Sequence, residues 1–128
     1  MKSKEEILAE INRKEMSKIN KGNKTTMLNY YNKVLNEFFS VKEALTQENK
    51  SKIFLVYNSC NENEINFTEF IQDLISNWEK YHRELKLPKW IMYPKLDFIA
   101  KERVMFIFGY KKFKETGIKI KKEKLIWE

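Results

Sequence analysis

The side chains best suited to chemistry lie between Cys60 and His82, which are the only cysteine and the only histidine of the chain. Two pairs of carboxylates fall in the same stretch, Glu62 with Glu64 and Glu69 with Asp73. A cysteine beside a histidine can act as a nucleophile, and paired carboxylates can exchange protons with a substrate. No local signature of a cysteine nucleophile surrounds Cys60, however, and carboxylates on a helix face are usually solvated. We therefore predict a protein that is not an enzyme.

Metal and cofactor sites are equally poorly supported. One cysteine and one histidine cannot supply the four ligands of a structural zinc site. The three glycines, Gly22, Gly109 and Gly117, are too scattered to form a phosphate-binding loop. The sequence therefore predicts no metal, no cofactor and no small-molecule substrate.

Residues 58–69, NSCNENEINFTE, nevertheless have the length of a calcium-binding loop. Ile65 stands at the central apolar position and Glu69 at position 12, so the stretch resembles a degenerate EF-hand. The ligands depart from the pattern, because a neutral Asn58 occupies position 1, a soft Cys60 thiol occupies position 3 and Asn63 replaces the turn glycine. Asparagine tolerates positive φ, so Asn63 could still make the turn.

The same residues are also typical of the N-terminus of a helix. Asn66 can cap the helix with Glu69 three residues later, in the arrangement of a capping box. Ile65 before the cap and Phe70 after it would form a hydrophobic staple. We favour this interpretation, which leaves the acidic loop available as a surface.

The C-terminal segment, YKKFKETGIKIKKEKLIWE, combines positive charge with aromatic rings. Its candidate phosphate-binding residues are Lys111, Lys112, Lys114, Lys119, Lys121, Lys122 and Lys124. Tyr110, Phe113 and Trp127 lie among them and could stack on bases. Lysine prevails over arginine, which predicts binding to the nucleic-acid backbone more than to base edges. The alternative is a solvated lysine-rich face.

Aromatic side chains suggest a protein interface as a second route to function. Tryptophan and tyrosine are the residues that most often anchor interfaces, and this chain holds more of them than a small core easily accommodates. The candidate contact residues are Trp78, Tyr81, Trp90, Tyr93 and Trp127. A homodimer, or a complex with one larger protein, would bury them.

The elements that must position these residues are mainly helices. Apolar residues recur at steps of three and four over 27–45 and again over 67–85, where Pro88 ends the pattern. Thr46 can cap a helix over 47–57, although IFLVY could also be a short buried strand. A capping box at Ser3 and Glu6 predicts an opening helix that ends near residues 21–23, and its thin apolar face predicts loose docking of residues 1–22.

The last third of the chain is less regular. The connector over 87–97 holds two prolines but is too apolar for a free linker, so we expect it to pack as an ordered crossover. Asp97 can cap a helix that Gly117 closes, although RVMFIFGY could also form a strand. Alternating apolar and charged residues after Gly117 suit a terminal strand or hairpin. The predicted fold is a compact, mainly α domain of four to five helices, with an α+β domain as the alternative.

Length, composition and charge bound the remaining options. The 128 residues fit one domain, with 42% hydrophobic residues for a core. The net charge of +7 is uneven, since residues 59–86 carry −3 and residues 109–128 carry +4. No leader and no membrane span are visible, and a single cysteine suits a reducing compartment, so we expect a cytoplasmic protein that does not enter membranes. The abundance of Lys, Asn, Ile and Glu suggests an AT-rich genome, such as that of a low-GC bacterium or its phage or plasmid.

These observations predict a small, non-catalytic binding protein. In the first hypothesis its basic ends hold nucleic acid, as an accessory or regulatory factor would. In the second it is a phage- or plasmid-encoded stoichiometric inhibitor, or an antitoxin-like partner, of a protein that handles nucleic acid.

Overall fold

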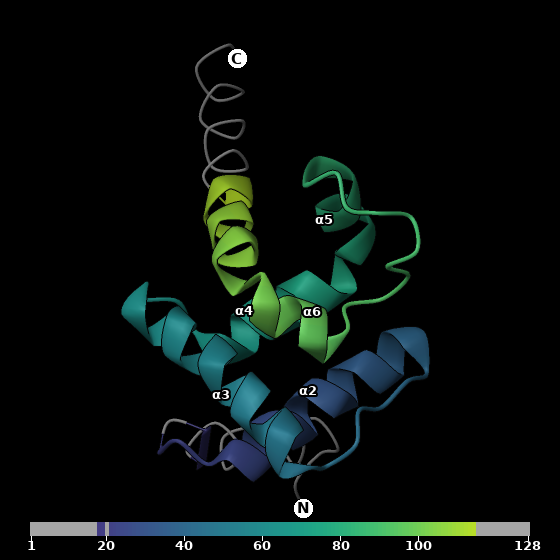
Figure 1. Cartoon of the computed structure of the whole chain (residues 1–128). Coiled ribbons are helices and arrows are strands. Elements are labelled where there is room, and N and C mark those ends of the chain that lie inside the picture. The colour runs from purple at the N-terminus through teal and green to yellow at the C-terminus, as the bar shows by residue number, and fades with distance from the viewer. Residues whose placement is uncertain (1–17, 20, 115–128) are drawn as a thin grey trace, which may run out of the picture.

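The described part of the chain is built from helices joined by short turns. In the computed structural model these are residues 18–19 and 21–114, and they contain no strand (Figure 1). The helices are α2 (Lys24–Phe39), α3 (Gln47–Glu62), α4 (Phe67–Ser76), α5 (Trp78–Glu84) and α6 (Leu96–Lys101). Residues 103–114 form a further helical segment. Among the described residues, 18–19 and 21–114, no helix is both long enough and apolar enough to cross a bilayer. The predicted mainly α fold is confirmed.

One hydrophobic core joins all of these elements. α2 packs against α3 and α4, and α3 also packs against α6. α5 and the segment 103–114 rise from the same side of this layer in Figure 1. Fully buried rings come from four different helical elements, with Tyr31 on α2, Phe70 on α4, Tyr81 on α5 and Phe106 on the segment 103–114.

Side-chain caps explain where α2 and α3 begin. The Asn23 side chain accepts from the Thr26 N–H, and Thr46 caps α3 by accepting from the Asn49 N–H at 3.1 Å. The IFLVY run therefore belongs to a helix and does not form the alternative buried strand. Gly22, with φ of +82°, ends the preceding helical turn where the sequence predicted.

The helix predicted over 27–45 ends earlier than its apolar pattern. Ser40 adopts a left-handed φ of +56° and its N–H bonds to the Asn36 carbonyl. The buried Asn32 amide then holds the returning chain by donating to the Glu43 carbonyl and accepting from its N–H, at 3.0 and 2.8 Å. These two tertiary hydrogen bonds outweigh the helical periodicity, so the prediction that residues 40–45 are helical is wrong.

Two other predicted helices are each interrupted once. Asn77, with φ of −110° and ψ of 30°, separates α4 from α5, and its side chain donates to the Asp73 carbonyl at 3.1 Å. Glu102 separates α6 from the segment 103–114 in the same conformation. Asp97 does not cap α6; its carboxylate instead pairs with Lys52 at 3.0 Å, which lowers the pKa of Asp97. The strand alternative for 103–110 is wrong, and the predicted terminal strand lies outside the described residues.

The turn between α3 and α4 has the hydrogen bonds of a Schellman motif. The Ile65 N–H donates to the Cys60 carbonyl at 2.8 Å and the Glu64 N–H donates to the Asn61 carbonyl at 3.1 Å. The left-handed residue is Glu64, with φ of +57°, and not Asn63, whose φ is −104°. The left-handed turn that the calcium-loop interpretation would have allowed at Asn63 is therefore made by Glu64.

We expect Glu64→Gly to stabilise the fold by about 0.5–1 kcal/mol, because glycine adopts positive φ without steric cost. Asn63→Gly is the matched control one residue earlier. Its backbone is not left-handed and its side chain donates to the Ser59 carbonyl at 2.8 Å, so it should destabilise the fold by about 1 kcal/mol. Urea denaturation measures both changes, and a destabilising Glu64→Gly would contradict the assignment.

Candidate functional site

The acidic stretch does not form a calcium loop. Asn58 to Glu62 lie within α3, so the first five positions of the EF-hand pattern are helical. Asn66 caps α4 by accepting from the Glu69 N–H at 3.1 Å, as the helix-entrance interpretation predicted. Within the described residues, no three His, Cys, Asp or Glu side chains are grouped so that they could hold a metal ion.

Cys60 and His82 each serve a structural contact. Cys60 is fully buried in α3, and burial raises the pKa of its thiol to about 12. His82 lies on α5 and its Nε2 is 2.9 Å from the Pro88 carbonyl oxygen. Because a carbonyl oxygen only accepts, this nitrogen carries the proton and helps to fix the connector that follows.

The predicted phosphate-binding lysines are partly engaged within the chain. Lys111 donates to the Asn63 side chain at 2.8 Å. Lys114 lies 3.9 Å from a Glu69 oxygen and 4.7 Å from the centre of the Tyr110 ring, and its interaction with Tyr110 contributes most to raising its pKa. Lys112 is exposed. The other members of the set, Lys119, Lys121, Lys122 and Lys124, lie outside the described residues.

The structure separates the predicted interface aromatics into two groups. Trp78 and Tyr81 are buried, and this corrects their prediction as contact residues. The break at Asn77 starts a new helix, which buries Trp78 and Tyr81 around Phe106, with ring centres 5.9 and 6.4 Å away. Trp90 is 78% exposed, Tyr93 is half-buried, and Trp127 lies outside the described residues.

The connector over 87–95 displays Trp90 because its neighbours are fixed inside. Leu87, Ile91 and Pro94 are buried, and the Tyr31 hydroxyl donates to the Pro94 carbonyl. The prediction of an ordered crossover is confirmed. Trp90 lies in a turn in which the Ile91 N–H donates to the Pro88 carbonyl at 3.1 Å, and Trp90 and Met92 face outward on either side of the buried Ile91.

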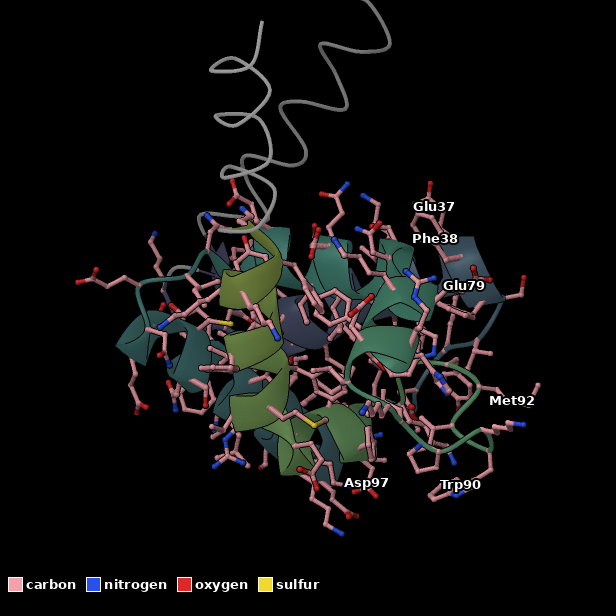
Figure 2. All side chains as sticks on the ribbon, turned by 90° about the horizontal axis from the view of Figure 1, so that it is seen from above. Glu37, Phe38, Glu79, Trp90, Met92 and Asp97 are labelled. Carbon is pink, nitrogen blue, oxygen red and sulfur yellow. The ribbon has the colours of Figure 1, made fainter. Side chains whose placement is uncertain are left out.

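Exposed and half-buried apolar residues on the connector and at the end of α2 form a surface that we term the apolar edge. Its members are Phe38, Phe39, Trp90, Met92 and Tyr93. The rings of Phe39 and Tyr93 join the two segments, with centres 6.4 Å apart. Figure 2 shows Phe38, Met92 and Trp90 along one side of the molecule, and Figure 1 places the end of α2 and the connector on that side as well.

Several of these surface residues were not predicted from the sequence. Phe38 lies within the apolar helical pattern over 27–45, yet it is 50% exposed near the end of α2. Met92 is 79% exposed, and only its alternation with the buried Ile91 could have signalled this. Val104 and Phe108 are also exposed, one turn apart on the segment 103–114, away from the apolar edge.

The connector itself carries charge of one sign. Lys86, Lys89 and Lys95 are exposed, and no acidic residue lies between Glu84 and Asp97 along the sequence. Trp90 and Met92 therefore have only positive charges as their neighbours along this part of the chain.

Comparison with protein-family models, with curated proteins and with solved structures finds no match to this chain. The functional argument therefore depends on the exposed surface and on the contacts that hold it.

Proposed function

We propose that this protein binds another protein through the apolar edge and carries out no catalysis. The observation that carries the proposal is the presentation of Trp90 and Met92, which are 78% and 79% exposed on a connector that is anchored in the core by Leu87, Ile91 and Pro94. Tryptophan is the most enriched residue at interface hot spots, and methionine adapts to a partner's surface. A side chain that is already positioned loses little freedom on binding, which favours affinity.

The charges of the connector indicate the chemistry of the partner's surface. Lys86, Lys89 and Lys95 flank Trp90 along the sequence without a carboxylate among them, so a complementary surface offers an apolar recess with an acidic rim. A protein that handles nucleic acid commonly exposes a basic surface and not an acidic one. An inhibitor of such a protein, however, often contacts acidic segments elsewhere on its target. We therefore define the partner by its acidic rim, and a second copy of the chain remains one form that it could take.

A second candidate function has an observation of its own. Trp90 among Lys86, Lys89 and Lys95 has the composition of a stacking platform for single-stranded nucleic acid. Met92 and Phe38 add no group that binds phosphate, and Lys111 and Lys114 already contact Asn63 and Glu69. Protein docking accounts for more of the surface, and nucleic-acid binding through Trp90 and these connector lysines is the second proposal.

The test compares the natural chain with a Trp90→Ala/Met92→Ala variant in capture from nuclease-treated lysate. Loss of an interface tryptophan should weaken a stoichiometric complex about 30-fold or more. Leu45→Ala is the matched control, since Leu45 is an exposed apolar residue on a different connector. Circular dichroism checks that both variants fold.

Equal capture of the same stoichiometric protein by the double variant would contradict docking through the apolar edge. Capture that disappears with nuclease, together with retardation of single strands that fades steeply with salt, would favour the second candidate instead. Sedimentation of the purified chain distinguishes self-association from binding to a different protein.

A further inference from the structure

The turn between α3 and α4 borders a recess of about 290 Å³, which we term the α3–α4 recess and which can hold one large side chain. Three of its lining residues are buried and apolar: Ile19, Tyr57 and Phe67. The half-buried Ile65 adds apolar surface that a ligand can reach. The exposed lining residues are polar: Asn61, Glu64 and Asn66. Apolar side chains therefore form the floor of the recess and polar side chains form its rim.

Glu64 gives this rim a negative charge. It is the only charged residue among those lining the recess, and no lysine or arginine of the described residues is in an ion pair with it. Lys18 and Lys21 adjoin Ile19 along the sequence, but neither lines the recess. The pocket between the end of α2 and the junction of α4 and α5 differs, because two cations and one carboxylate line it. Of these two pockets, the α3–α4 recess therefore has the charge that attracts a basic segment.

The connector of the apolar edge has the matching features. Trp90 is 78% exposed, and the lysines that flank it along the sequence are Lys86, Lys89 and Lys95. None of these lysines is in an ion pair within the described residues. An indole has an apolar ring and one N–H donor, so it suits a recess with an apolar floor and with amide and carboxylate acceptors at the rim.

The recess and the edge belong to one chain but lie apart on it. Figure 1 shows the turn between α3 and α4 on the opposite side of the molecule from the connector over 87–95. Because Ile91 and Pro94 anchor the connector in the core, Trp90 cannot reach the recess of its own chain. Two copies that met edge to edge would place lysines against lysines, which opposes a symmetric contact. A second copy must therefore meet the edge with a different surface, and the α3–α4 recess is complementary to it in charge and shape.

We infer that the apolar edge docks in the α3–α4 recess of a second copy of this chain, with Trp90 in the recess and the connector lysines beside Glu64. The inference rests on the proposed docking function and names the partner as another copy. Such a contact is heterologous, so each copy can use both surfaces and association continues beyond two copies unless a ring closes. One ring and a few ion pairs make a small interface, for which we expect a Kd of about 100 µM.

Sedimentation velocity of the purified full chain tests the inference at concentrations from about 10 to about 500 µM, which bracket the expected Kd. The natural chain should form species larger than a dimer as its concentration rises. Trp90→Ala should weaken this association about 30-fold, because an interface tryptophan is lost. Glu64→Lys should weaken it about tenfold, because it places a lysine against the connector lysines.

Two further variants separate the recess from net charge. Asn61→Trp puts a ring at an exposed position in the lining and should fill the recess, so it should weaken association about tenfold or more. Glu62→Lys is the matched control for Glu64→Lys. It changes the net charge equally at an exposed residue that does not line the recess, and it should change association by no more than about twofold.

A mixture of variants distinguishes head-to-tail contact from symmetric contact. Trp90→Ala retains the recess and Asn61→Trp retains Trp90, so an equimolar mixture should form a one-to-one pair and nothing larger. Circular dichroism checks that every variant folds.

A natural chain that stays monomeric over the whole range, undiminished association of Asn61→Trp, or equal effects of Glu62→Lys and Glu64→Lys would overturn the inference. If the chain is monomeric while the Trp90→Ala/Met92→Ala variant loses a different captured protein, self-association is refuted and the docking proposal stands.

Discussion

Phe106→Ala is expected to destabilise the fold by about 3–5 kcal/mol, a large part of the stability of a small domain. Phe106 is fully buried and its ring lies 5.8 Å from that of Phe98 as well as close to Trp78 and Tyr81. Removing it opens a cavity where α5, α6 and the segment 103–114 meet. It also removes edge-to-face and tilted ring contacts that stabilise beyond the buried area.

Phe108→Ala is the matched control, two residues along the same helical segment. Phe108 is 70% exposed, so its loss should change the free energy of unfolding by no more than about 0.5 kcal/mol. Urea denaturation followed by circular dichroism measures both variants, and Phe106→Leu provides a milder change if the alanine variant does not fold. Similar costs for Phe106→Ala and Phe108→Ala would contradict the described burial.

Stability should also fall by about 4–5 kcal/mol between pH 8 and pH 11. Three buried groups are held neutral in the folded chain: the Cys60 thiol and the Tyr31 and Tyr81 hydroxyls. Burial is the main cause that raises the pKa of each of them, and hydrogen bonding to Asp73 raises that of Tyr81 further. In the unfolded chain the thiol ionises near pH 9 and the phenols near pH 10, so the unfolded state loses protons first and gains stability as pH rises.

The contribution of one group can be removed in isolation. The Tyr81 hydroxyl donates to Asp73 at 2.6 Å, so Tyr81→Phe should cost about 1 kcal/mol at neutral pH. Above pH 10 the same variant should lose stability less steeply than the natural chain, by about 1.4 kcal/mol per pH unit. Unfolding free energies measured at intervals from pH 8 to pH 11 test both statements, and a flat profile would show that these groups are not protected.

The docking surface and the core are consequences of the same packing. Ile91 and Pro94 fix the connector from below, and this leaves Trp90 and Met92 on the outside. Burial of Trp78 beside Phe106 encloses its indole N–H, which has no hydrogen-bond partner among the described residues. The residues that stabilise the fold thus also define the shape that a partner would meet.

The sequence alone determined those features that depend on neighbours within a few residues. Thr46 and Asn66 bond to N–H groups three residues away, and Gly22 supplies a left-handed turn at its own position. Apolar spacing and scarce glycine and proline were enough to predict the helical class. The free energies of capping and of turn formation depend on residues a few positions apart, so a short stretch of sequence is enough to predict these features.

Only the tertiary structure decided which aromatic residues are core and which are surface. Trp78 and Trp90 are the same residue type, yet the first packs among rings from distant segments and the second lies outside a fixed connector. Asn32 with Glu43, and Tyr31 with Pro94, bond across 11 and 63 positions, and these contacts set where α2 ends and how the connector lies. Such contacts depend on how whole helices pack, because a side chain is buried by whatever reaches it in space and not by its neighbours along the chain.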